Sequence, residues 1–366
     1  TYGVAIGYRS GNGSQGTNAV AVGSNAGYSS QGNYSVAIGA NAGTTSQNTN
    51  SVAIGNSAGN TSQNTYALAI GYYAGNASQL SYSIALGYQA GQTNQNPTAV
   101  AVGSLAGNDT QGEFSVAVGR QAGNYQQGHS SVALGHVAGN DHQGADAVAI
   151  GTAAGKNSQQ GGAVAIGRGA GAGYDGVQGW DAVAIGYYTA QNAQGNYAIA
   201  IGNNAGGGSQ YYDAIAIGTY AGQTNQLWST VAIGNQAGQT NQGASSVAIG
   251  RSAGEYYQDW DAIAIGRYTG NSNQGRYAVA LGYYAGNSSQ GTGSIAIGEY
   301  AGYNGQAQNS IVLNASGVEL DGIDSGLYIN PVRYTVAQDA TDDGIMFYNQ
   351  TTKEVRYSYA LDGGSF

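Results

Sequence analysis

Few residues of this chain have types that could support catalysis or metal binding. The absence of cysteine removes disulfides, thiolate metal sites and thiol catalysis. A metal site needs convergent ligands at bonding distance, yet the clustered histidines occupy different positions of a repeat, and the aspartates that share one position never fall on adjacent copies. We therefore expect no enzyme activity, no metal and no cofactor. The residues in question are His129, His136, His142, Asp146, Asp181, Asp213 and Asp261.

These side chains lie on a repeat of sixteen residues, and the repeat determines the secondary structure. The tetrapeptide Val/Ile/Leu–Ala–Ile/Val/Leu–Gly occurs 19 times, and one three-residue insertion between Gly167 and Gly186 interrupts the spacing. A strict period of about one supersecondary unit indicates a solenoid, in which each repeat buries its apolar face by stacking on its neighbours. The sequence therefore predicts an all-β rod, a parallel β-solenoid (β-roll) of 16-residue coils.

Within the tetrapeptide, the two large residues are two positions apart and so share one face of a strand. We expect residues such as Val4 and Ile6 to face the core and Ala5 to face outward. Two large side chains per coil offset the ordering entropy of sixteen residues only weakly. The outward alanine row therefore predicts a second burial surface between chains. On this assignment, Ile150→Asp should destabilise the protein more than Gln143→Ala.

Glutamine follows the motif glycine by eight residues in every coil, or by eleven in the coil with the insertion. The row could be a ligand-binding stripe, or an amide ladder in which each side chain bonds the next along the rod. Its identity in all coils favours the ladder. The ladder comprises Gln15, Gln31, Gln47, Gln63, Gln79, Gln95, Gln111, Gln127, Gln143, Gln159, Gln178, Gln194, Gln210, Gln226, Gln242, Gln258, Gln274, Gln290 and Gln306.

Aromatic residues recur two positions after the glutamine, in a set that we call the Trp row. The row varies in identity from coil to coil, as solvent-facing positions do. Aromatic rings beside amides suit sugar faces and protein interfaces, although they could equally hold neighbouring coils or chains together. The insertion is either a tolerated surface loop or a binding loop. The candidate surface-recognition residues are Tyr174, Trp180, Tyr212, Trp228 and Trp260.

The net charge and the apolar runs exclude two further classes of protein, and the end of the repeat indicates the domain boundary. The formal net charge is −9 without a basic stripe, which argues against nucleic acid, and no run approaches the ~18 apolar residues of a membrane span. The chain starts in register at Thr1, which is typical of a processed product or a piece of a longer protein. We expect residues 1–314 to form the array, 19 coils plus a terminal coil, and residues 315–366 to form a small β-rich cap or trimerisation domain, with a hairpin over 347–357.

The motif Ser-Val-Ala-Ile-Gly-x-x-Ala-Gly, at Ser35–Gly43, Ser51–Gly59 and Ser246–Gly254, resembles the head repeats of YadA-type trimeric autotransporter adhesins. The segment from Ser310 to Tyr357 resembles one that follows such repeats in tail fibres of phages and large viruses. The resemblance implies left-handed coils and a bundle of three chains. The period here is longer than is usual in that family, so the turns must differ.

Together these features predict a non-enzymatic fibre protein: a trimeric β-solenoid shaft of a viral tail fibre or surface adhesin that mediates host-surface or glycan attachment. The alternative is a self-assembling extracellular filament subunit with a purely structural role, because an uncapped first coil leaves an edge able to pair. The expected partners are the chain itself, as a homotrimer or end-to-end fibre, and a cell-surface glycan. The expected location is extracellular, on a cell surface or a virion.

Overall fold

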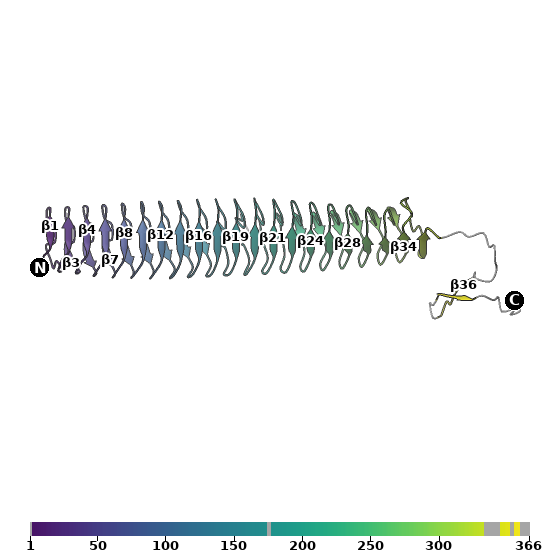
Figure 1. The fold of residues 1–366 in the computed structure, drawn as a ribbon, viewed down its shortest axis with the longest axis horizontal. Helices are drawn as coiled ribbons and strands as arrows, with labels where there is room; N and C mark the ends of the chain where they lie inside the picture. Colours follow the sequence, from purple (N-terminus) through teal and green to yellow (C-terminus); the bar gives the residue numbers. More distant parts are fainter. Residues whose placement is uncertain (1, 174–176, 333–344, 352–354, 359–366) are drawn as a thin grey trace.

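The computed structural model describes residues 2–173, 177–332, 345–351 and 355–358, and all regular structure in these ranges is strand. Most of the chain winds into a straight rod in which every coil adds one short strand to the same parallel sheet (Figure 1). Consecutive coils are about sixteen residues apart in the pairing register. The prediction of an all-β parallel β-solenoid is thus confirmed.

The long sheet has 21 strands, each of which pairs in parallel with the strand of the next coil. Its strands are β1 (Val4–Ile6), β2 (Val20–Val22), β4 (Val36–Ile38), β6 (Val52–Ile54), β8 (Leu68–Ile70), β10 (Ile84–Leu86), β12 (Val100–Val102), β14 (Val116–Val118), β16 (Val132–Leu134), β18 (Val148–Ile150), β19 (Val164–Ile166), β20 (Val183–Ile185), β21 (Ile199–Ile201), β22 (Ile215–Ile217), β24 (Val231–Ile233), β26 (Val247–Ile249), β28 (Ile263–Ile265), β30 (Val279–Leu281), β32 (Ile295–Ile297), β34 (Ile311–Asn314) and β35 (Leu327–Asn330).

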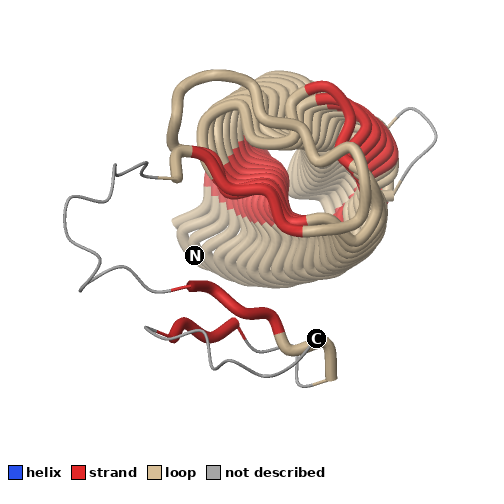
Figure 2. The backbone as a smooth tube through the Cα atoms, turned by 90° about the vertical axis from the view of Figure 1, so that its right-hand side faces the viewer, coloured by secondary structure: helices blue, strands red, loops and turns tan. Residues whose placement is uncertain are grey.

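Two shorter parallel sheets run along another side of the coils (Figure 2). Each of their strands ends at a residue of the glutamine row. Between them, over the coils around the insertion, isolated bridges between successive glutamines maintain the pairing. The first short sheet contains β3 (Ser29–Gln31), β5 (Thr45–Gln47), β7 (Thr61–Gln63), β9 (Ala77–Gln79), β11 (Thr93–Gln95), β13 (Asp109–Gln111), β15 (Tyr125–Gln127) and β17 (Asp141–Gln143). The second contains β23 (Thr224–Gln226), β25 (Thr240–Gln242), β27 (Tyr256–Gln258), β29 (Ser272–Gln274), β31 (Ser288–Gln290) and β33 (Asn304–Gln306).

The motif glycine is required where the chain leaves the long sheet. Gly55 has a φ of 126°, and a Cβ atom on it would lie 2.6 Å from the carbonyl oxygen of Gly71 in the next coil. A side chain would therefore collide with backbone that cannot move without breaking the stack. The same approach recurs from coil to coil, which explains why the sequence keeps glycine at every copy.

The predicted inside and outside of the long sheet are reversed. Ala53 is completely buried, whereas Val52 and Ile54 on the same strand are only half-buried and face outward. The same pattern holds on the strands between β2 and β32: the alanine lies in the core and the large residues lie outside. The expectation that the Val-x-Ile face forms the core was therefore wrong.

The narrow cross-section of the coil is the reason. A Cβ atom on Gly59, on the wall opposite the long sheet, would lie 3.2 Å from the Cβ of Ala53 and 2.7 Å from Oε1 of Gln63. The interior has room for one methyl group on each wall and one glutamine side chain, and overpacking such a site destabilises it. A valine or isoleucine must therefore point outward.

The glutamine row occupies the centre of this core. In all 19 coils the Nε2 group donates to the carbonyl oxygen of the first residue of the long-sheet strand of the same coil, at 2.7–3.0 Å. In twelve pairs of coils, Nε2 also reaches Oε1 of the next glutamine, at 3.0–3.3 Å. Each glutamine thus ties two walls of its coil together and, in those pairs, links adjacent coils.

We expect Gln143→Ala to lower the stability of its coil by about 1–3 kcal/mol, because it removes buried hydrogen bonds and leaves acceptors without a donor. Gln143 is 2 % exposed and donates to the carbonyl of Val132 and to Oε1 of Gln159. The exposed Gln126 provides the control, since Gln126→Ala removes the same side chain from the surface. Hydrogen exchange of the backbone amides around residue 143 measures the effect. Equal protection in both variants would contradict the bridging role.

The stacking continues beyond Asn314, where the repeat pattern ends. β35 pairs with β34 in register, from Ile311 opposite Leu327 to Asn314 opposite Asn330. Farther along, β36 (Ile345–Tyr348) and β37 (Val355–Ser358) form the antiparallel hairpin that the sequence indicated.

Candidate recognition surface

Three of the five candidate recognition residues form one aromatic cluster on the Trp row. The rings of Tyr212 and Trp228, on adjacent coils, are stacked with their centroids 6.2 Å apart. Trp228 and Trp260 are two coils apart, yet their rings meet edge to face at 5.8 Å. Ala244 lies on the coil between them and is buried, so its small side chain leaves room for the two indoles to touch.

The other two candidates do not join this cluster. Trp180 occupies the same row, but its ring lies over the backbone of Gly161, where a Cβ atom would be 2.5 Å from Cζ3 of the indole. Tyr174 lies outside the described residues. The candidates on the Trp row therefore divide into a cluster and a separate tryptophan.

An open hollow of about 600 Å³ lies next to the aromatic cluster, and a second of about 410 Å³ adjoins it at Tyr211. Together they make a trough along the rod, which we call the axial groove. It spans the coils from Gln194 to Gln274. The residues that line it are Ala193, Gln194, Gly195, Asn196, Ser209, Gln210, Tyr211, Tyr212, Asn225, Leu227, Asn241, Gln242, Gly243, Tyr257, Gln258, Asp259, Trp260, Asn273, Gln274 and Gly275.

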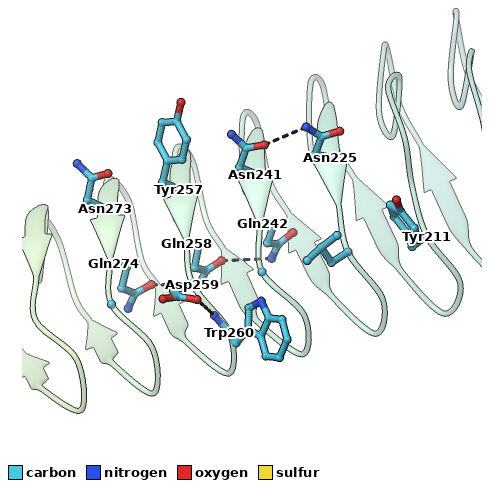
Figure 3. A pocket seen from close by; sticks show the side chains of 13 residues that line it. Tyr211, Asn225, Asn241, Gln242, Tyr257, Gln258, Asp259, Trp260, Asn273 and Gln274 are labelled. Atoms are coloured by element: carbon cyan, nitrogen blue, oxygen red, sulfur yellow. Dashed lines mark hydrogen bonds between the residues drawn. The ribbon is translucent and has the colours of Figure 1, made fainter.

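The groove follows from the positions of neighbouring rows on each coil. The residue before the glutamine points away from the rod and forms one wall, as Asn241 and Tyr257 do in Figure 3. The Trp row forms the other wall with Trp260. The residue directly after the glutamine is glycine at Gly243 and Gly275, so the floor there carries no side chain. The arrangement is an open trough that runs along several coils and is lined by amide and aromatic side chains.

The groove is polar and carries little charge. Asp259, the one charged residue among those that line it, accepts a hydrogen bond from the backbone N–H of Trp260 at 2.7 Å. The guanidinium of Arg276 lies 4.9 Å from the centre of the Trp260 ring, within the range of a cation–π contact. Nearby, the almost buried Glu255 accepts a hydrogen bond from Nδ2 of Asn271 at 2.8 Å. A hydrogen bond to Glu255 and the charge of its carboxylate raise the pKa of Tyr256.

Sequence reasoning missed the wall formed by the residue before the glutamine. A composition change could have revealed it, because Ser-Gln is common in the first half of the array, whereas Asn-Gln or Tyr-Gln occurs at Gln226, Gln242, Gln258 and Gln274.

The sequence also did not explain why several aspartates occupy the same position of the repeat. Asp146 and Asp261 have φ values of 58° and 55°, in the left-handed region that aspartate and asparagine tolerate better than most residues.

Nδ1 of His142 lies 2.6 Å from Oδ1 of the adjacent Asp141. Across the part of the chain that the structure describes, no three histidine or acidic side chains are grouped so that they could hold a metal ion. In the same residues there is no helix with the length and apolar character of a membrane span.

The fold and the surface are those of a rod-shaped parallel β-solenoid with short repeats. The family model of the YadA head domain repeat matches residues 14–42, 30–58 and 192–205. These segments therefore match the YadA head repeat, the adhesin-type repeat that the motifs of the chain resembled. No curated protein and no solved structure is significantly similar to it.

Proposed function

We propose that this chain is a non-enzymatic fibre protein, a homotrimeric shaft of a surface adhesin or viral tail fibre that attaches to a host surface through glycan. The observation that carries the proposal is the outer face of the long sheet. There the large apolar residues form two rows along the rod that a single chain leaves half-exposed.

The extent of this outer face argues for self-association. Ile38, Leu86, Leu134, Leu281 and Ile297 are all exposed on it, and the remaining members of the two rows between β2 and β32 are half-buried. Full burial of one such side chain contributes about 1.5–3 kcal/mol, and soluble monomers rarely leave long apolar patches open. Because every coil repeats the same pair in register, a parallel copy of the chain matches it row for row.

The number three rests on the resemblance to trimeric autotransporter adhesins, whose head repeat matches segments of this chain. In such a bundle the outer faces of three long sheets would meet around a common axis. The short sheets and the axial groove lie on other sides of each coil and stay accessible. The outer face of the long sheet would then serve assembly, and the side with the axial groove would serve attachment. The proposed location is extracellular, on a cell surface or a virion.

Size and shape test the proposal. We expect light scattering to give three times the chain mass of 36.8 kDa, and electron microscopy to show discrete rods about 100 Å long, from the ~4.8 Å spacing of strands. Long polymers with an axial repeat near one rod would instead favour the purely structural filament. A stable monomer would overturn the trimer, and failure of the rods to bind host cells would overturn the attachment role.

A further inference from the structure

We propose that the axial groove binds an extended, uncharged oligosaccharide that lies along the rod, with Tyr211, Tyr257 and Trp260 as its aromatic contacts. The inference rests on the proposed attachment function. It assigns that function to one site and one class of ligand.

The shape of the groove fits a chain of sugar rings. Trp260 and Tyr257 face it from opposite walls and are 42 % and 57 % exposed, while Tyr211 joins its two parts. Trp260 is fixed in place by Trp228 on one coil and Arg276 on another. Ordered aromatic rings with accessible apolar surface pack against the C–H faces of sugars at little cost in conformational entropy.

Hydrogen-bonding groups line the same walls. Nδ2 of Asn225 donates to Oδ1 of Asn241 at 3.0 Å, so the oxygen of Asn241 is used and its Nδ2 group can donate to a ligand (Figure 3). The side-chain amide of Asn273, which also lines the groove, makes no hydrogen bond within the described residues. Amides offer both donors and acceptors, and the carboxylate of Asp259 adds acceptors. Sugar hydroxyls both donate and accept, so a mixed set of this kind suits them.

Charge favours a neutral glycan over an acidic one. The only charged side chain among those that line the groove is that of Asp259, in a chain whose formal net charge is −9. A sialylated or sulfated sugar would bring its own negative charge next to this carboxylate.

The backbone argues against a peptide as the occupant. Extended peptides commonly bind by adding a strand to an open sheet edge. Here β23, β25, β27 and β29 run across the groove and are already paired with one another along the rod. The groove therefore presents side chains rather than a free strand edge.

The repeat distance sets the expected length of the ligand. Six coils, from Gln194 to Gln274, lie along the groove, and five steps of ~4.8 Å give about 24 Å. Each ring of an extended β-1,4-linked glycan advances by about one such step. We therefore expect affinity to rise with chain length and to level off at about five sugar units.

The test is calorimetric titration of the full chain with cello-oligosaccharides and fully N-acetylated chito-oligosaccharides of two to six units, together with a sialylated and a sulfated oligosaccharide. We expect binding of a neutral series that strengthens with length, and a loss of about tenfold or more for Trp260→Ala, as for a central aromatic contact. Asn273→Ala should weaken binding less. The matched comparisons are Trp180→Ala, on the same row but outside the groove, and Asn94→Ala, at the same coil position with a similar φ. Neither should change the affinity.

Two kinds of failure are distinguishable. If the rods bind host cells but neither neutral series, or if Trp180→Ala and Trp260→Ala weaken binding equally, the groove assignment is overturned while the attachment function stands. Preferential binding of the acidic sugars would also overturn it. If the rods bind neither cells nor sugars, the attachment function fails as well. Circular dichroism of each variant confirms that the fold is retained.

Discussion

Ala149→Leu is expected to destabilise the middle of the rod by roughly 3 kcal/mol, at the upper end of the cost of overpacking a core. The Cβ of Ala149 lies 3.3 Å from the point where a Cβ on Gly155 would sit, and Oε1 of Gln159 lies 2.6 Å from that point. The added carbons of leucine therefore have no space to enter. Because the strands of each coil pair only with those of the adjacent coils, the loss should be largest around residue 149.

Hydrogen exchange of the amides in β16, β18 and β19 measures this effect, with thermal unfolding as a second readout. Thr152→Leu is the matched control, because Thr152 is exposed and lies in the same coil. We expect this control to stay within about 0.5 kcal/mol of the unchanged protein. If the two leucine variants are equally stable, the alanine row does not fill the core.

The double substitution Val148→Asp and Ile150→Asp is expected to disrupt the trimer while each chain keeps its strands. Both residues are half-buried on the outer face of the long sheet. In a trimer the new carboxylates would be buried at the interface without partners, which is strongly unfavourable. In a single chain they would remain in water, so the coil itself should tolerate them.

Sedimentation velocity measures the assembly, and circular dichroism checks the strand content. Gln126→Asp adds a charge at an exposed position before the glutamine row, away from the long sheet, and should leave the trimer intact. Trimers that persist in the double variant would place the interface elsewhere. Loss of strand content instead of dissociation would mean that Val148 and Ile150 belong to the core of the coil.

The sequence by itself determined the architecture of the rod. A fixed period and identical motif residues require that every coil adopt the same conformation and stack in register, so the parallel strands, their spacing and the alignment of the glutamines could be predicted. The YadA-type motif could also be identified directly in the amino-acid sequence. The hairpin of β36 and β37 followed from local residue types.

Only the tertiary structure decided which face of the strand lies inside. Alternation along Val148, Ala149 and Ile150 defines two faces, but it does not say which one a closed coil encloses. The distance between the walls selects alanine, because a methyl group and one glutamine side chain already fill the space. The fold also decided that the glutamine row lies inside the coil, where each side chain joins two walls in addition to bonding the next glutamine along the rod.

The axial groove could also not be predicted from the sequence. It depends on rows from six coils that come together only after stacking, and on which way each side chain points from its turn. The tryptophans looked equivalent in the repeat, yet Ala244 brings Trp228 and Trp260 together while Trp180 packs on Gly161. A periodic sequence fixes what repeats along the rod. The departures from the repeat acquire a role only through the neighbours that the fold gives them.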